Sequence, residues 1–323
     1  GALGLGDDGA AFARSSPTQV GAETIWSKAA GGQWFSMALK TDGTVWAWGK
    51  NDSGQVGDGT ITNRNSPVQV GALTTWSDIA SSYHAAFAIK TDGTMWSWGR
   101  NNYGQLGLGN TTYYSSPVQI GALTTWSKLA AGASQGHRMA LKTDGTIWTW
   151  GYNNVGQLGH GNTTYRSSPI QVGALTTWLE VACGRYSSFA IKTDGTLYAW
   201  GYNYWGMLGL GNTTNYSSPV QVGALTTWSK VASGGNFTIA IKTDGTIWTI
   251  GGYNAQGQLG QGDTTHRSSP VQIGALTTWS KVASGGNFTG VTKTDGTLWA
   301  WGAGNQGQLG QGNTTNYSSP VQV

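Results

Sequence analysis

The strongest constraint on the fold of this chain is an internal repeat of about fifty residues. The tetrapeptide Thr-Asp-Gly-Thr returns at intervals of 50, 52, 50, 50 and 51 residues, and it begins at Thr41, Thr91, Thr143, Thr193, Thr243 and Thr294. A fixed period of this length predicts a stacked or radial repeat architecture in one domain over residues 1–323. The complete copies are 21–70, 71–120, 121–172, 173–222, 223–273 and 274–323, and residues 1–20 form a partial copy.

Each copy contains four short segments that we expect to form strands. They are rich in Val, Ile, Trp and Thr and are separated by Gly, Pro and Asn. The first is the Pro-Val-Gln-Val segment, as in 67–70, and the other three are represented by 228–232, 237–242 and 247–250. The Asp-Gly pair between the last two segments favours a tight hairpin turn, because such turns need positive φ angles.

The repeat therefore predicts an all-β fold, a β-propeller built from four-stranded antiparallel blades. Tryptophan supports this interpretation, because 16 of the 18 Trp occupy repeated strand positions where they can pack between blades. The two exceptions are Trp34 and Trp205. Six blades are favoured and seven stay possible, since residues 15–17 and 318–320 both supply the Ser-Ser-Pro strand. We expect N- and C-terminal strands to close the propeller in one mixed sheet, or the surplus strand to pair with a neighbouring molecule.

The repeated motifs resemble those of a known family. Gly-x-Asn-x-x-Gly-Gln-Leu-Gly after a Trp, together with Asp-Gly-Thr and Pro-Val-Gln-Val, is similar to the regulator of chromosome condensation repeat family, over essentially the whole chain. The resemblance implies a β-propeller, typically with seven blades. The family's usual His after the Trp-led strand survives clearly only as His137, with His84 one position off, which suggests a distant bacterial or viral member. The resemblance also implies exchange-factor activity on a small GTPase, enzyme inhibition or ultraviolet sensing as possible roles.

Composition excludes several classes of function. Charged residues make up 10% of the chain, and the net charge of +4 is dispersed, so we expect no nucleic-acid partner. The chain has no apolar run long enough for membrane insertion. The four His are scattered over different copies, and no nucleophile elbow, zinc motif or phosphate loop occurs, so we expect no catalytic site, metal or cofactor.

Comparison of the copies points to one rim of the propeller as a binding surface. The Asp-Gly turns and Gly-Ala-Leu-Thr-Thr links are nearly identical, whereas the loops expected on the opposite side differ from copy to copy. Loop diversity on a constant scaffold is typical of binding sites, although neutral drift can also produce it. The candidate partner-binding residues on this rim are Trp34, Tyr83, His84, His137, Arg138, Tyr186, Tyr204 and Trp205.

The leading hypothesis is a non-enzymatic binding or adhesion propeller, extracellular or on a virion surface, that contacts a protein or a glycan. The first alternative is a self-assembling structural protein that forms homo-oligomers through the surplus strand or a rim. The second alternative is a GTPase exchange factor or enzyme inhibitor, as the family resemblance implies. Nearly uniform loop lengths argue against the second alternative.

Overall fold

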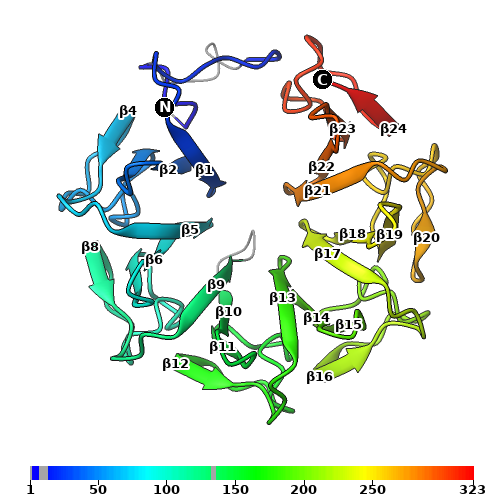
Figure 1. The fold of residues 1–323 in the computed structure, drawn as a ribbon, viewed down its shortest axis with the longest axis horizontal. Coiled ribbons are helices and arrows are strands. Elements are labelled where there is room, and N and C mark those ends of the chain that lie inside the picture. The colour runs from blue at the N-terminus through cyan, green and yellow to red at the C-terminus, as the bar shows by residue number, and fades with distance from the viewer. Residues whose placement is uncertain (1, 7–13, 132–135) are drawn as a thin grey trace. The chain divides into compact units, whose positions relative to one another are not determined.

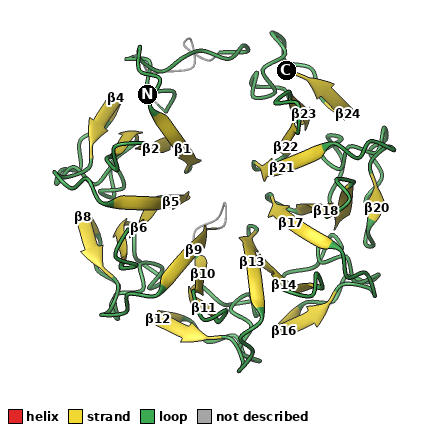
Figure 2. Cartoon of the chain, viewed as in Figure 1, coloured by secondary structure: helices red, strands yellow, loops and turns green. Residues whose placement is uncertain are grey.

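The computed structural model describes residues 2–6, 14–131 and 136–323 of the chain, which forms two compact units. Unit 1 comprises residues 1–12, 19–153 and 164–176, and unit 2 comprises residues 13–18, 154–163 and 177–323. The described residues are strands and loops, without a helix (Figure 2). In that part of the chain no apolar helix of membrane-spanning length was found. A single domain over residues 1–323 stays a prediction.

Unit 1 contains three blades, each formed by one copy of the repeat (Figure 1). Blade 1 consists of β1 (Trp26–Gly31), β2 (Phe35–Lys40), β3 (Val45–Gly49) and β4 (Arg64–Gln69). Blade 2 consists of β5 (Trp76–Ser82), β6 (Ala85–Lys90), β7 (Met95–Gly99) and β8 (Tyr114–Gln119). Blade 3 consists of β9 (Trp126–Ala131), β10 (His137–Lys142), β11 (Ile147–Gly151) and β12 (Arg166–Gln171).

Unit 2 contains three further blades of the same design. Blade 4 consists of β13 (Trp178–Cys183), β14 (Ser187–Lys192), β15 (Leu197–Gly201) and β16 (Tyr216–Gln221). Blade 5 consists of β17 (Trp228–Ser233), β18 (Phe237–Lys242), β19 (Ile247–Gly252) and β20 (Val271–Gln272). Blade 6 consists of β21 (Trp279–Ser284), β22 (Phe288–Lys293), β23 (Leu298–Gly302) and β24 (Tyr317–Gln322). The predicted all-β architecture of four-stranded antiparallel blades, six in number, is confirmed.

The order of strands within a blade differs from the expected one. The Pro-Val-Gln segment is the fourth strand and pairs with the Trp-rich third strand of its own copy, so that Trp46 lies opposite Gln69. The loop between them is held by the buried side chain of Asn51, whose Nδ2 donates to the carbonyl oxygens of Thr60 at 3.1 Å and Thr62 at 3.0 Å. This loop turns the chain back onto the third strand, whereas the Gly-Ala-Leu-Thr-Thr segment leads to the next blade.

The expected mixed closing sheet is absent from the described residues, because each of the six sheets takes all four strands from one copy. The partial copy instead provides contacts that neighbouring blades make elsewhere. In unit 2, Gly312 N donates to the carbonyl of Ser15 at 2.7 Å, just as Gly262 N donates to Ser318. In unit 1, Gly6 N donates to the carbonyl of Asn65 at 2.9 Å. Residues of the partial copy therefore cover parts of blades 1 and 6 without adding a strand to either.

Adjacent blades are joined by buried tryptophans, as the repeat predicts. Trp150 on β11 is completely buried, and its Nε1 donates to the carbonyl of Gln105 in the preceding blade at 2.9 Å. Its ring also packs on Phe87, with the ring centres 6.5 Å apart. Burial of such a side chain stabilises the fold by about 2–3 kcal/mol, and the bonded indole N–H leaves no buried donor unsatisfied.

Candidate partner-binding rim

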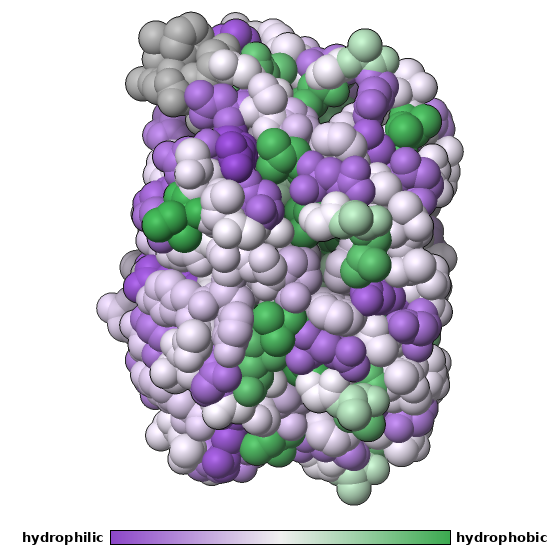
Figure 3. All heavy atoms as spheres, turned by 90° about the vertical axis from the view of Figure 1, so that its left-hand side faces the viewer, coloured by the Kyte–Doolittle hydropathy of each residue, from purple (hydrophilic) through white to green (hydrophobic). Residues whose placement is uncertain are grey.

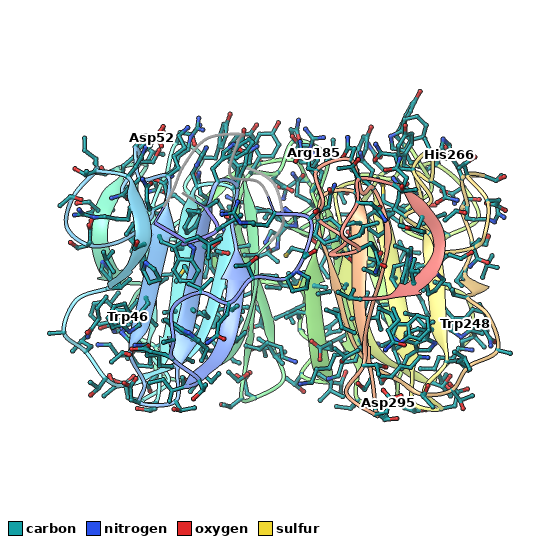
Figure 4. The ribbon with its side chains drawn as sticks, turned by 90° about the horizontal axis from the view of Figure 1, so that it is seen from above. Trp46, Asp52, Arg185, Trp248, His266 and Asp295 are labelled. Carbon is teal, nitrogen blue, oxygen red and sulfur yellow. The ribbon has the colours of Figure 1, made fainter. Side chains whose placement is uncertain are left out.

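Two sets of connections emerge at opposite edges of the blades. We call the loops between first and second strands and between third and fourth strands the variable rim, for example residues 184–186 and 253–270. The Asp-Gly turns and the Gly-Ala-Leu-Thr-Thr links form the uniform rim, for example residues 294–297 and 274–278. In unit 2, Arg185 and His266 lie at one edge of the blades, and Asp295 lies at the other (Figure 4).

The uniform rim is repeated because its residues are fixed by the turn they form. In blade 1, the Asp42 carboxylate accepts hydrogen bonds from the Thr44 amide at 2.9 Å and from the Thr44 hydroxyl at 2.7 Å. These two donors hold the pKa of Asp42 below its usual value. Gly43 has a φ of 79°, and a Cβ there would lie 2.2 Å from the carbonyl oxygen of Thr74. This sequence suits the turn closely, so its repetition is explained by folding.

The repeated lysines before these turns are also part of the scaffold. In blade 3, Lys142 Nζ lies 3.7 Å from the centre of the Trp148 ring and 5.1 Å from that of Trp126. Burial lowers the pKa of Lys142, and the nearby Asp144 carboxylate opposes that shift. A cation held over two aromatic rings is not available as part of a basic patch.

The variable rim of unit 2 carries a connected series of aromatic rings. We call this series the aromatic ladder; it consists of Tyr186, Tyr202, Tyr204, Trp205, Tyr253 and His266. The step from Tyr186 to Tyr202 is 6.2 Å between ring centres. Tyr202 and Tyr204 are stacked at 6.3 Å, with an interplanar angle of 16°. Loops of blades 4 and 5 therefore build one aromatic surface.

Trp205 is the centre of the ladder. Its ring lies 5.0 Å from Tyr204, 4.9 Å from Tyr253 and 5.1 Å from His266, with edge-to-face contacts. His266 is oriented by its Nδ1, which accepts a hydrogen bond from Asn254 N at 3.0 Å. Such contacts hold aromatic side chains in place before a partner arrives, which lowers the entropic cost of binding.

The same arrangement occurs on a smaller scale in unit 1. Tyr103 lies 5.0 Å from Tyr152 and 5.9 Å from Tyr165, and the rings of Tyr152 and Tyr165 are 4.8 Å apart. These tyrosines occupy the repeat positions that Trp205, Tyr253 and His266 occupy in unit 2. The aromatic clusters are thus a property of particular copies and not of the repeat itself.

Five of the eight residues predicted for the rim reach its surface. Trp34 is 60% exposed and has a positive φ of 69°, and Tyr204 is 63% exposed. Tyr83, Tyr186 and Trp205 are half-buried. Trp205 and Tyr204 belong to the ladder with Tyr186, while Tyr83 contacts the ring of His84 at 4.5 Å.

The other three predicted residues, His84, His137 and Arg138, are buried and do not form part of the surface. His84 Nδ1 lies 3.2 Å from Gln55 Nε2, and burial lowers the pKa of this histidine. The guanidinium of Arg138 donates to the carbonyl of His137 and to the hydroxyl of Ser82. His84 directly precedes β6, and His137 and Arg138 are the first two residues of β10, where their side chains face protein.

Sequence reasoning missed Tyr202, Tyr253 and His266 of the ladder. Their signal was present in two variable columns of the repeat. The residue after the third-strand Gly is Lys50, Arg100, Tyr152, Tyr202, Tyr253 or Ala303. The residue before the fourth strand is Asn63, Tyr113, Tyr165, Asn215, His266 or Asn316. Both positions are aromatic in blade 5, next to Trp205 of blade 4, and likewise in blade 3, next to Tyr103 of blade 2.

A concave feature of unit 1 is lined in part by residues of the uniform rim. In unit 1, a pocket of about 250 Å³ is lined by Trp126, Trp148, Leu123, Ile120 and Pro169, among others. Leu123 belongs to the uniform rim and is 44% exposed. On the side of the molecule that carries β4 and β8, hydrophobic side chains form small patches separated by hydrophilic ones (Figure 3). No group of His, Cys, Asp and Glu within the described residues is arranged to hold a metal ion.

Comparison with protein families gives matches along most of the chain. A family model described as Regulator of chromosome condensation (RCC1) repeat matches residues 42–89, 92–140, 144–191, 194–241, 244–291 and 295–323. A second model with the same description matches residues 26–55, 76–105 and 228–258. Each match of the first model begins in an Asp-Gly turn, so that the match over 42–89, for example, covers the last two strands of blade 1 and the first two of blade 2.

Among curated proteins, the similar segments are short. The mouse (Mus musculus) Protein RCC2 is 40% identical over 57 residues, which is 17% of this chain and 11% of that protein. The Arabidopsis thaliana Ultraviolet-B receptor UVR8 is 50% identical over 36 residues, which is 11% of this chain and 8% of that protein. The aligned segments thus span about a tenth of the length of these relatives.

Solved structures resemble this chain over much longer stretches. Human WBSCR16 has a TM-score of 0.86 at 23% identity, over 96% of this chain and 84% of that chain. Prp20p from Saccharomyces cerevisiae has a TM-score of 0.81 at 19% identity, over 92% of this chain and 76% of that chain. Prp20p was described with its binding properties to Gsp1p and histones. At these identities the likeness concerns the fold.

Proposed function

Because the chain belongs to the regulator of chromosome condensation (RCC1) repeat family, we propose that it is a non-enzymatic propeller that binds a protein partner through its variable rim. The observation that carries this proposal is the aromatic ladder, a set of partly exposed rings held in place by their mutual contacts. Tyr and Trp are the residue types that dominate protein interfaces, and Tyr204 and Trp205 present large rings at low entropic cost.

Among protein partners, a small GTPase is the first class to test. This choice is supported by the similarity of fold to Prp20p, whose described partners are Gsp1p and histones. It also agrees with the family resemblance seen in the repeat motifs. A role as an exchange factor would need rim loops that hold the nucleotide-free form of the GTPase more tightly than the loaded form.

The other hypotheses from the sequence have less support. A glycan partner rests on the exposed aromatic rings alone. Self-assembly through an outer strand is disfavoured, because β4 and β8 contain Pro67 and Pro117, which lack the N–H that strand pairing needs. An extracellular or virion-surface location stays a proposal that rests on the low content of charged residues.

The test compares variants on the two rims of the folded chain. We would measure the binding of purified small GTPases, both nucleotide-free and GDP-bound, and the rate at which they release a fluorescent GDP analogue. We expect Trp34→Ala with Trp205→Ala to weaken binding at least about tenfold, as loss of interface anchors does.

The matched control on the uniform rim is Leu73→Ala with Leu225→Ala, because both leucines are exposed, at 42% and 41%. These changes should leave binding unchanged. Loss of binding in the control alone would place the interface on the uniform rim. If no GTPase binds but another protein binds and depends on the variable-rim residues, the GTPase class is rejected and the variable rim remains the proposed binding surface.

A further inference from the structure

The aromatic ladder has features that restrict the chemistry of what binds it. Its rings are accessible: Tyr204 is 63% exposed, His266 is exposed, and Tyr202, Trp205 and Tyr253 are half-buried. Successive ring centres lie 4.9–6.3 Å apart from Tyr202 to Tyr253. Because Tyr202 and Tyr204 are stacked while the Tyr204–Trp205 and Trp205–Tyr253 contacts are edge-to-face, the ladder contains rings in both orientations.

The polar atoms of the ladder are one indole N–H, which only donates, and tyrosine hydroxyls, which donate or accept, together with the ring nitrogens of His266. Within the described residues, the indole N–H of Trp205 and the hydroxyls of Tyr204 and Tyr253 have no hydrogen-bond partner. The acceptor Nδ1 of His266 is already occupied by Asn254 N at 3.0 Å. A ligand that offers acceptors beside apolar faces is therefore complementary to these donors and rings.

The charges around the ladder are few and balanced. The carboxylate of Asp263, the acid nearest His266 in the same loop, accepts a hydrogen bond from Arg267 Nη2 at 2.6 Å. Arg185 lies at the far end, with its guanidinium 5.3 Å from the ring centre of Tyr186. Burial raises the pKa of Tyr202, so this phenol stays neutral. The ladder thus offers no unpaired carboxylate to a basic ligand and no cluster of cations to an acidic one.

We infer that the aromatic ladder binds an uncharged, proline-rich segment of the protein partner in the polyproline II conformation. Proline rings supply flat apolar faces, and a chain without N–H groups offers only carbonyl acceptors, which match the donors of Trp205 and Tyr204. One turn of this helix is about 9 Å long and so faces about two rings of the ladder. Grooves between aromatic rings are a known way to recognise such segments.

A neutral glycan fits the ladder less well. Sugar hydroxyls donate as well as accept hydrogen bonds, and the side chains of the ladder offer them only tyrosine hydroxyls as acceptors. Here the only carboxylate in the loop of His266 is paired with Arg267. This inference rests on the proposed protein partner at the variable rim and identifies the type of segment that the rim holds.

The test uses the full chain and a fluorescently labelled decaproline peptide, with a glycine-serine peptide of equal length and cellohexaose as comparison probes. We expect decaproline to bind and the two comparison probes to bind at least about tenfold more weakly. Trp205→Ala and Tyr204→Ala should each raise the Kd for decaproline about tenfold or more. Trp205→Phe, which keeps a ring but lacks the indole N–H, should raise it by a smaller factor.

The matched control is Leu225→Ala, which removes an exposed apolar side chain from the uniform rim of unit 2, outside the ladder, and should leave the Kd unchanged. If Trp205→Ala does not fold, as judged by circular dichroism, Trp205→Phe and Tyr204→Ser serve in its place. The inference is overturned if decaproline fails to bind, if cellohexaose or the glycine-serine peptide binds as tightly, or if the ladder variants bind decaproline normally. If the chain binds a GTPase or another protein through the variable rim but does not bind decaproline, this inference is overturned and the proposed function still holds.

Discussion

The ammonium nitrogen of Lys142 lies 3.7 Å from the centre of the Trp148 ring, at the end of the hairpin that the Asp-Gly turn closes. The corresponding lysine–tryptophan distances in the other blades that have this Trp are 3.8–3.9 Å. In blade 4, Tyr198 replaces the Trp, and Lys192 donates to its hydroxyl at 3.0 Å. The repeated lysine therefore joins the second and third strands of every blade by its cationic head.

This relationship predicts that Lys142→Met lowers the free energy of unfolding. The variant keeps most of the apolar stem but loses the cation over two rings, which we expect to cost about 1–2 kcal/mol at a site with 6% exposure. Lys142→Arg should retain most of the stability. Urea denaturation followed by tryptophan fluorescence measures both changes, and a Met variant as stable as the parent would show that the contact contributes nothing.

The blades could be predicted from the sequence because their signals are local and repeated six times. The Asp-Gly pairs specify turns, and the segments with alternating Trp or with several Val specify strands, each within a few residues. The observed β18, for example, has the predicted bounds 237–242. The pairing partner of the Pro-Val-Gln strand is not a local property. It depends on the loop held by Asn51, whose hydrogen bonds reach residues 9 and 11 positions away.

The binding rim was predicted less completely, because the exposure of a residue at the end of a strand depends on how the neighbouring elements pack around it. His84 and Arg138 are polar residues in a variable segment, and this suggested surface positions. His84 instead directly precedes β6, Arg138 is the second residue of β10, and both are buried, at 7% and 1% exposure. In contrast, Tyr253 and Trp205 come from different copies, so their contact at 4.9 Å could be found only from the packing of blades 4 and 5.

A second prediction concerns the glycine that lies against Trp150. Gly107 has a φ of 75°, and a Cβ there would lie 2.9 Å from Trp150 Nε1, whereas a Cβ on Gly121, with a φ of 58°, would meet nothing within 4 Å. Gly121→Ala should therefore cost only the backbone strain, about 1–2 kcal/mol. Gly107→Ala should cost a further 1–3 kcal/mol or so, because it displaces a buried ring.

Thermal unfolding of the two variants tests this difference, since the backbone strain is common to both. A larger loss for Gly121→Ala would contradict the close approach of Gly107 to the tryptophan. An equal loss would indicate that the Trp150 ring moves without cost.

A third prediction concerns acid. The Thr146 hydroxyl and amide donate to Asp144 at 2.6 and 2.9 Å, and they lower its pKa in the folded protein. An acid whose folded pKa is depressed contributes stability above its unfolded pKa, and this contribution is lost as the pH falls through the folded value. The melting temperature should therefore fall as the pH drops below about 4, where unfolded aspartates take up protons.

Asp144→Asn should reduce the dependence of the melting temperature on pH between neutrality and pH values below about 4, because it removes one of the six equivalent carboxylates. Asp52→Asn is a useful comparison on the variable rim. Burial raises the pKa of the Asp52 carboxyl, but hydrogen bonds from Lys50 and Gln55 outweigh this effect, so the pKa of Asp52 is also lowered. A pH dependence unchanged by Asp144→Asn would mean that the turn carboxylate is no better stabilised in the folded chain than in the unfolded one.

The last prediction separates the tryptophans of the scaffold from those of the rim. Trp150 is completely buried, donates to Gln105 O at 2.9 Å and packs on Phe87, so Trp150→Ala should cost about 3–5 kcal/mol. Trp205 contacts other rings but lies half-buried at the surface, and Trp205→Ala should cost about 1 kcal/mol or less. Denaturant unfolding of both variants provides the measurement. If both variants lose the same free energy of unfolding, Trp205 belongs to the core. The ladder would then stabilise the fold and would not be a binding surface.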